Sequence, residues 1–226
     1  MRRHHYKPYL GEHGTVIRPA PTTNGITARY ENFSYSGSTW FDLTPVPANG
    51  AGTGFGGGVD WPRFDGAQWV TIGQPSKLAL TGNMSFVAWS SQDSGTSGFE
   101  RVMSRGAASP LIFSLKDSNG HPFILVKVSG AAKSIEGSSV INDGEWHMIA
   151  ATYDGAKLKL YVDGALDAEL VAAGTGQIDT ANDLYFGSNN GSSSLEGRID
   201  TCRIYSRSLS AGEILNDYNA GKPAHP

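Results

Sequence analysis

Short runs in which apolar and polar residues alternate recur from residue 64 onward, and they predict β-strands. The run 157–162 places Leu158, Leu160 and Val162 on one face, with two lysines and a tyrosine on the other. Because successive side chains of a strand point to opposite faces, this pattern predicts a half-buried antiparallel strand. The run 83–90 carries large apolar side chains at both sets of alternating positions, which predicts a strand covered on both faces. The other predicted strands are 69–72, 111–115, 122–128, 145–153, 183–187 and 198–205.

Asp-Gly and Asn-Gly pairs punctuate these runs. They occur at 65–66, 119–120, 143–144, 154–155, 163–164 and 190–191. Both dipeptides accept the positive φ angles of two-residue hairpin turns, so each pair predicts a strand reversal.

One short helix is predicted near the end of the chain. Ser210 and Glu213 have the spacing of a capping box, with Ser210 as the N-cap. Leu209 and Ile214 have the spacing of a hydrophobic staple, and Gly221 followed by a proline predicts the helix end. Many short strands and a single helix predict an all-β fold built as an antiparallel two-sheet sandwich.

The pattern before residue 64 is irregular. Residues 1–34 hold few apolar clusters and three prolines that favour extended backbone, so they predict an extended N-terminal arm. Residues 35–63 combine aromatic residues, prolines and the glycine-rich run 50–58, which lacks the Lys-Ser/Thr ending of a phosphate-binding loop. The predicted organisation is therefore an arm at 1–34, a connecting segment at 35–63 and a sandwich at 64–226.

Composition excludes several classes of protein. Charged residues make up 17% of the 226 residues, which argues against a coiled coil, and the 29 glycines lack the three-residue period of collagen. A single cysteine excludes a disulfide scaffold. No apolar stretch approaches the about 18 residues of a transmembrane helix, so we expect no membrane association. The first ten residues have no apolar segment of a signal peptide, and Met1 favours a protein that does not use that route.

Charge is distributed unevenly along the chain. Residues 1–20 carry a net charge of +3, from Arg2, Arg3, Lys7 and Arg18 against Glu12, whereas the other 206 residues carry −6. A basic arm on an acidic body is suited to docking on a partner, and we predict that it binds neighbouring subunits of an assembly. The alternative is a solvated tail without function. Nucleic acid is a poor candidate for the partner, because the body is acidic and no nucleic-acid-binding motif is present.

Three segments carry a resemblance to a known family. Segment 143–164 reads DGEWHMIAATYDGAKLKLYVDG and resembles the central signature of the laminin G-like, concanavalin A-like lectin/glucanase superfamily. Segment 195–214 resembles the last strand and short helix of that family, and 64–66 with 80–89 resembles its opening strands. The resemblance covers about 64–221 and implies a concanavalin A-like jelly-roll sandwich.

The chain lacks the residues expected of a catalytic member of the superfamily. Laminarinase-like members carry a Glu-x-Asp-x-x-Glu strand motif, which is absent here, and a retaining glycosidase needs two carboxylates about 5–5.5 Å apart. Glu145, Glu169 and Glu196 are interpreted as isolated residues near strand ends or turns. We therefore predict that the protein is not an enzyme. His147 is expected to have a structural hydrogen-bonding or surface role.

Cys202 is interpreted as a buried small apolar residue rather than a reactive thiol. Ile199 and Cys202 are three positions apart in one predicted strand. If both point inward, the period of two is broken and a β-bulge is required.

The resemblance also implies a calcium site. Members of the family often hold one Ca²⁺ where the first and last strands meet, and Asp65 and Asp200 are the matching positions here. The alternative is that Asp65 forms a turn and that Asp200 pairs with Arg203 or caps a loop.

Sugars stack on exposed aromatic rings, and the candidate carbohydrate-binding residues are Trp40, Trp61, Trp89 and Phe99. The alternative is that these aromatic residues belong to the core.

Two functions follow from these observations. The first is a non-catalytic virion (phage capsid) surface or decoration subunit, whose arm docks on neighbouring subunits and whose lectin-like sandwich faces outward. The second is a carbohydrate-binding module of a secreted or cell-surface protein, located outside the cell.

Overall fold

The computed structural model describes residues 24–36, 39–45, 47, 49–53, 63–94, 98–105, 111–116, 119–178 and 181–225. These residues form β-strands, one α-helix, α1 (Ala211–Gly221), and two short 3-10 helices at Ser76–Leu78 and Lys222–Ala224. Every strand pair is antiparallel, so the predicted all-β antiparallel fold is confirmed. No helix among the described residues is long and apolar enough to span a membrane.

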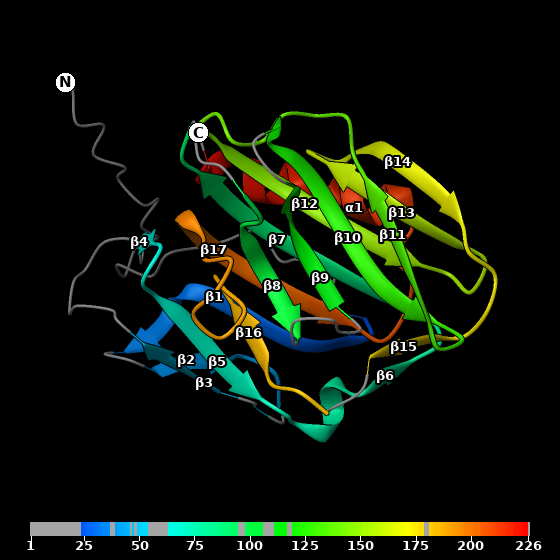
Figure 1. Ribbon diagram of the computed structural model, residues 1–226, viewed down its shortest axis with the longest axis horizontal. Helices are drawn as coiled ribbons and strands as arrows, with labels where there is room; N and C mark the ends of the chain where they lie inside the picture. The colour runs from blue at the N-terminus through cyan, green and yellow to red at the C-terminus, as the bar shows by residue number, and fades with distance from the viewer. Residues whose placement is uncertain are drawn as a thin grey trace.

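The strands form two sheets that pack face to face (Figure 1). The sheet that carries α1 on its outer face is called the back sheet. Its order is β2 (Thr39–Asp42), β1 (Ile26–Ser36), β17 (Glu196–Tyr205), β7 (Met84–Gln92), β12 (Trp146–Tyr153), β13 (Lys157–Val162) and β14 (Ala165–Val171), and β4 (Arg63–Asp65) pairs with the start of β17.

The other sheet is called the front sheet. Its order is β3 (Gly50–Thr53), β5 (Trp69–Gly73), β16 (Leu184–Phe186), β8 (Arg101–Arg105), β9 (Leu111–Lys116), β10 (His121–Val128) and β11 (Ala131–Glu136), and β15 (Gly176–Ile178) links β10 to β6 (Leu80–Thr81). Because β2 also pairs with β3, the hydrogen-bond ladders of the two sheets are continuous at that edge.

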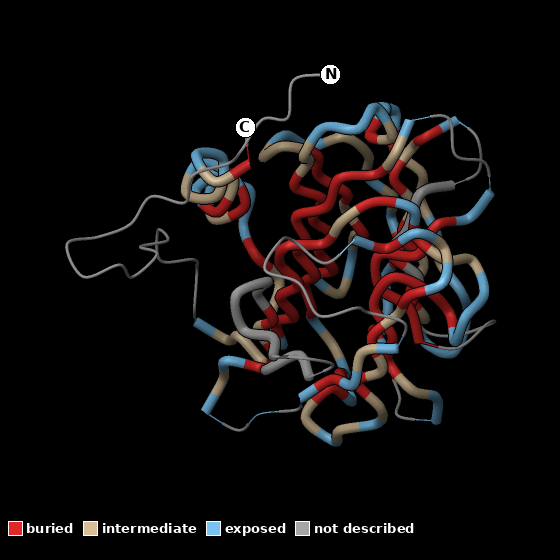
Figure 2. The backbone as a smooth tube through the Cα atoms, turned by 90° about the vertical axis from the view of Figure 1, so that its left-hand side faces the viewer, coloured by how far each residue is buried: buried red, intermediate tan, exposed pale blue. Residues whose placement is uncertain are grey.

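Two apolar clusters stabilise this arrangement. The main core lies between the sheets and receives Met84, Phe86 and Ala88 from β7, whereas Val87 and Trp89 point to a second cluster beneath α1. All nine residues of β7 are buried, which confirms that both of its faces are covered. Figure 2 shows the buried segments in the interior and the helix on the outside of one sheet.

The predicted boundary at residue 64 is wrong. β1 pairs with β17, and its Ala28 and Tyr30 are fully buried in the main core. β2 and β3, within the predicted connecting segment, join the two sheets. The alternation of Ile26, Ala28 and Tyr30 was the available signal, but a single small alanine and a polar continuation made it weak. Residues 1–23 of the predicted arm lie outside the described residues.

The predicted turns divide into two kinds. Asp163-Gly164 and Asn190-Gly191 have positive φ at both positions, as a type I′ turn requires, and each reverses the chain onto its neighbour. The pairs at 119–120 and 154–155 also lie between paired strands. The pairs at 65–66 and 143–144 do not reverse a strand, because β4 pairs with β17 and β12 pairs with β7.

The bulge expected in the last strand is present. The register of β17 against β7 shifts between Ile199 and Thr201, and Ile199 and Cys202 both lie in the main core. The extra residue restores inward positions three apart. Cys202 is free and buried, as predicted.

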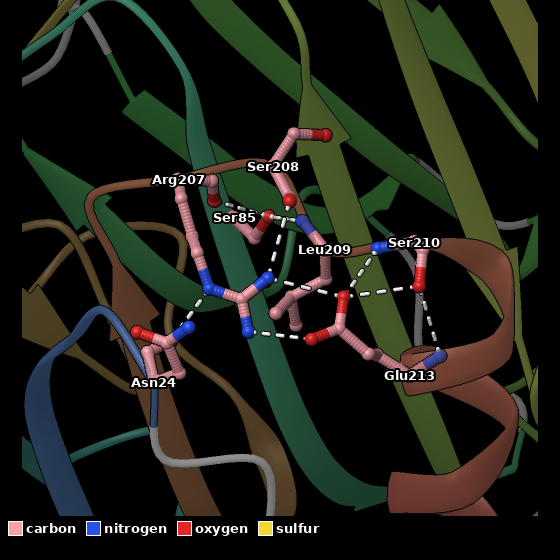
Figure 3. Close-up of polar contacts among 7 residues, drawn as sticks. All are labelled: Asn24, Ser85, Arg207, Ser208, Leu209, Ser210 and Glu213. Carbon is pink, nitrogen blue, oxygen red and sulfur yellow. Dashed lines mark hydrogen bonds and ion pairs between the residues drawn. The ribbon is translucent and has the colours of Figure 1, made fainter.

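Helix α1 begins as the sequence predicts. The backbone N–H of Glu213 donates to the Ser210 hydroxyl at 3.3 Å, and the N–H of Ser210 donates to the Glu213 carboxylate at 2.9 Å. Arg207 donates to both carboxylate oxygens of Glu213, at 2.6 and 3.0 Å, and to the carbonyl of Asn24 (Figure 3). Leu209 and Ile214 are buried together in the second cluster. The cap therefore ties the helix to the chain just before β1.

Candidate functional site

The structure describes the side chains of two sequence-predicted glycan-binding residues, Phe99 and Trp89. Trp89 is buried in the second cluster beneath α1, so it is not available to a sugar. Phe99 is 44% exposed, on the loop that leads into β8. Trp40 lies in β2, but its side chain is outside the described part of the chain, as is the whole of Trp61. The candidate docking residues Arg2, Arg3, Lys7 and Arg18 also lie outside the described residues.

Phe99 belongs to a patch with Arg101 and Phe123, which we call the Phe99 patch. The rings of Phe99 and Phe123 meet edge to face, with centroids 6.1 Å apart. The Arg101 guanidinium carbon lies 5.8 Å from the centre of the Phe99 ring. An exposed ring is thus in contact with a buried guanidinium, and together they offer an apolar face and hydrogen-bond donors.

The register of the front sheet explains this grouping. Arg101 is opposite Ser114 in β9, Ser114 is opposite Phe123 in β10, and Phe123 is opposite Glu136 in β11. Directly opposed residues share a face of an antiparallel sheet. The neighbouring Phe113 and Ile124 point to the main core, so Arg101, Phe123 and Glu136 lie on the outer face.

Two contacts hold the loop that carries Phe99. The Glu100 side chain is buried and accepts a hydrogen bond from the backbone N–H of Glu196 at 3.2 Å. The backbone N–H of Arg101 donates to the carbonyl of Ser193 at 3.0 Å. The patch is therefore fixed at the point where β8 begins.

No sequence pattern indicated a role for Arg101. Its side chain is only 7% exposed, and its Nε and Nη1 atoms have no hydrogen-bond partner among the described residues. Burial lowers the pKa of Arg101 below its ordinary value. The sequence predicts no strand at Arg101, and a charged residue is ordinarily solvated, so only the tertiary structure identifies it as part of a site.

Asp65 and Asp200 do not share a site. Asp65 is opposite Glu196 at the start of β17, and Asp200 lies four residues further along, about 13 Å away at 3.3 Å per residue. The Asp200 carboxylate is fully buried and lies 2.7 Å from Nε2 of His225. No group of three or more histidine, cysteine, aspartate or glutamate side chains suited to a metal occurs within the described ranges. The two residues therefore do not fit the predicted calcium site as a pair.

Asp200 instead belongs to a buried polar cluster on the outer face of the back sheet. The His225 ring stacks on Trp89 at 4.1 Å, lies 5.0 Å from the ring of Trp146, and is hydrogen-bonded at Nδ1 with the carbonyl of Gly221. These contacts fasten the segment after α1 over the back sheet. The sequence did not indicate this role, because Asp200 and His225 are far apart along the chain.

His147 has the structural role expected of it. Its Nδ1 lies 2.8 Å from Asp163, and its Nε2 lies 3.2 Å from Asp143. The hydrogen bond with Asp163 raises the pKa of His147, and the neighbouring Asp143 acts in the same direction. Asp163 also accepts the backbone N–H of Met148, so the carboxylates orient the ring and join the turn to β12.

The carboxylates considered for catalysis are placed differently from one another. Glu169 is 2.6 Å from Lys157 on the edge of the back sheet. Glu196 was interpreted as isolated, but the structure places it directly opposite Asp65 across the β17–β4 ladder. Glu169 and Glu196 are both exposed to solvent.

The two antiparallel sheets packed face to face define a β-sandwich of the lectin-like class. Residues 64–215 match the family described as the concanavalin A-like lectin/glucanases superfamily, and the chain belongs to this family. The predicted resemblance is thereby confirmed. No curated protein sequence matches the chain.

Solved structures share the fold at low sequence identity. The binding domain of Paraclostridial Mosquitocidal Protein 1 is 16% identical, with a TM-score of 0.67 and coverage of 87% of this chain and 52% of that one. The botulinum neurotoxin serotype D ligand binding domain, in complex with N-acetylneuraminic acid, is 14% identical, with a TM-score of 0.65 and coverage of 87% and 51%. The chain thus spans about half the length of these two domains.

A third structure matches along nearly its whole length. Domain 4 of AbnA, an extracellular arabinanase from Geobacillus stearothermophilus, in complex with arabinotriose, is 19% identical, with a TM-score of 0.65. The match covers 85% of this chain and 98% of that domain. The three structural matches cover more of the chain than residues 64–215, in agreement with a sandwich that begins before residue 64.

Proposed function

We propose that this protein is a non-catalytic carbohydrate-binding domain that binds glycans at the Phe99 patch. The observation that carries the proposal is an exposed aromatic ring in contact with a second ring and a guanidinium on the outer face of the front sheet. Aromatic rings stack on the apolar faces of sugars, and a guanidinium donates hydrogen bonds to their oxygens. The structures of similar fold that contain N-acetylneuraminic acid and arabinotriose support a glycan as the ligand.

A glycan array on the full chain tests this proposal. We expect binding to at least one class of glycan, and we expect Phe99→Ala to weaken that binding at least tenfold. Leu166→Ala is the matched control, because Leu166 is an apolar side chain of similar exposure, 54%, on the edge strand β14. Silence across the array, or equal losses in the two variants, would contradict the proposal.

As a second proposal, the protein is a virion surface or decoration subunit. In that case it is located on the virion, whereas a carbohydrate-binding module would be located outside a cell. The virion role is supported by the charge contrast between residues 1–20 and the rest of the chain, which favours docking of that segment on other protein subunits. The test is removal of residues 1–23, which leaves β1 in place. Loss of incorporation into particles is expected, and unchanged incorporation would refute the role.

We also propose that Ca²⁺ binds the folded protein and stabilises it against unfolding. A ligand that binds the native state raises the melting temperature, so saturating Ca²⁺ should raise it, and Asp65→Asn should abolish the rise. An unchanged melting temperature at saturating Ca²⁺ would end this proposal.

A further inference from the structure

Arg101 is a buried cation without an anionic partner among the residues that the structure describes. The side chain is 93% buried, and neither Nε nor Nη1 has a hydrogen-bond partner among the described residues. Burial is the cause of its lowered pKa, and no carboxylate offsets that effect. The guanidinium therefore lacks the compensation that buried charges ordinarily have.

Such an arrangement destabilises the unliganded protein. Moving a charge out of water is costly unless an opposite charge or hydrogen-bond acceptors replace the lost hydration. Cation–aromatic attraction to Phe99 at 5.8 Å supplies only part of that compensation. An anion bound to the guanidinium would supply the rest of the electrostatic compensation. The desolvated guanidinium is therefore suited to binding an anionic ligand.

Resting on the proposed glycan-binding function, we propose that the ligand carries a carboxylate, which Arg101 binds while the sugar ring stacks on Phe99. The planar guanidinium matches a carboxylate with two parallel hydrogen bonds. Uronic acids and sialic acids are the sugars that carry this group.

The surroundings favour a singly charged sugar over a polyanion. Glu136 lies opposite Phe123 in the same row, with its carboxylate 3.5 Å from His121. The whole chain has a net charge of −3. Both features repel a polyphosphate backbone, whereas one carboxylate on one guanidinium is accommodated.

Phe99 is the exposed neighbour of the guanidinium. Its residue is 44% exposed, and the Arg101 guanidinium carbon lies over its ring, 5.8 Å from the centre. Rotamer changes of exposed side chains take picoseconds to nanoseconds, so the ring can turn aside and receive the sugar on its face.

The experiment compares sugars that differ in one group. Methyl glucuronide and methyl glucoside share a ring and differ by a carboxylate in place of a hydroxymethyl group, and titration calorimetry on the full chain measures both. The methyl glycoside of N-acetylneuraminic acid is a second acidic probe, and arabinotriose is a second neutral probe. We expect at least one acidic probe to bind about tenfold or more tightly than the neutral probes.

Arg101→Met should remove the preference for acidic over neutral sugars and leave the binding of neutral sugars intact. Arg101→Lys should retain part of the preference for acidic sugars. Lys127→Met is the matched control, since Lys127 is four residues from Phe123 on the same face of β10 and should not affect the preference. Equal binding of acidic and neutral probes would overturn the inference but leave the proposed function standing. Absence of binding to every probe and on the array would overturn both.

The melting temperature gives a readout that does not depend on the ligand. Removal of an uncompensated buried charge should leave Arg101→Met at least as stable as the native protein. A fall of more than about 4 °C would show that the guanidinium has a structural role, and it would overturn the inference.

Discussion

Replacement of Glu213 should loosen α1 from the back sheet by a predictable amount. Glu213 accepts two hydrogen bonds from Arg207 and two from Ser210, at distances of 2.6 to 3.0 Å (Figure 3). The hydrogen bonds from Arg207, followed by those from Ser210, lower the pKa of Glu213 from its ordinary value of 4.5 to about 2. Through Arg207 the same contacts reach Asn24, which precedes β1.

The pKa shift sets the scale of the effect. A displacement of that size corresponds to about 3 kcal/mol in favour of the ionised form. The Glu213 side chain is 32% exposed, so solvent screening reduces the contribution to about 1–2 kcal/mol. Loss of a helix cap costs a similar amount, about 1 kcal/mol. We therefore expect Glu213→Ala to lower the free energy of unfolding by about 1–2 kcal/mol at pH 7.

Urea denaturation followed by tryptophan fluorescence measures this change. Glu213→Gln keeps a capping side chain but removes the charge, so it should cost less than Glu213→Ala. Because the folded pKa is depressed, the stabilisation is present above pH 4.5 and is lost as the pH falls toward 2. The difference between the native protein and Glu213→Gln should therefore shrink between pH 6 and pH 3.

The control is Glu169→Gln, which removes a carboxylate from the exposed pair with Lys157 on the sheet edge and should have a smaller effect. The reasoning fails if Glu213→Gln equals the native protein at pH 7. It also fails if the difference stays constant down to pH 3.

Three further predictions follow. Deletion of residues 1–23 should leave a cooperative thermal transition in circular dichroism. Deletion of residues 1–34 should abolish the transition, because the core residue Tyr30 is lost. A cooperative transition in the longer deletion would refute the placement of β1. His147→Gln should destabilise the protein most below pH 6.5, with a difference that declines as the pH rises through the raised pKa of His147, and a difference independent of pH would contradict this. Cys202 should react with a thiol reagent only after denaturation, because burial raises its pKa and excludes the reagent, and rapid labelling of the native protein would disprove this.

Local sequence patterns were sufficient to predict elements whose defining residues lie within a few positions of one another. The predicted strands between residues 69 and 205 are all present, with ends that agree within two residues. The capping box at Ser210, the bulge between Ile199 and Cys202 and the double cover of β7 were also predictable. Each depends on alternation or on a fixed spacing, which the backbone enforces locally.

Several strands that the structure contains were not predicted. β11 and β14 are edge strands rich in alanine and charged residues, and β1 is marked only by Ile26, Ala28 and Tyr30. These strands form because neighbouring strands supply the pairing partners, as β17 does for β1. Pairing energy between distant segments has no signature in a window of a few residues.

The sequence by itself determined the class of fold, the family, and the turns and cap that punctuate it. Only the tertiary structure decided where the sandwich begins, that Asp200 is paired with His225 rather than with Asp65, and that Arg101 lies beneath an exposed Phe99. The physical reason is that burial and partnership of a charged group depend on which strands become neighbours. For Arg101 those neighbours are β9 and β10, and their arrangement in the front sheet makes this arginine a buried cation next to an exposed aromatic ring.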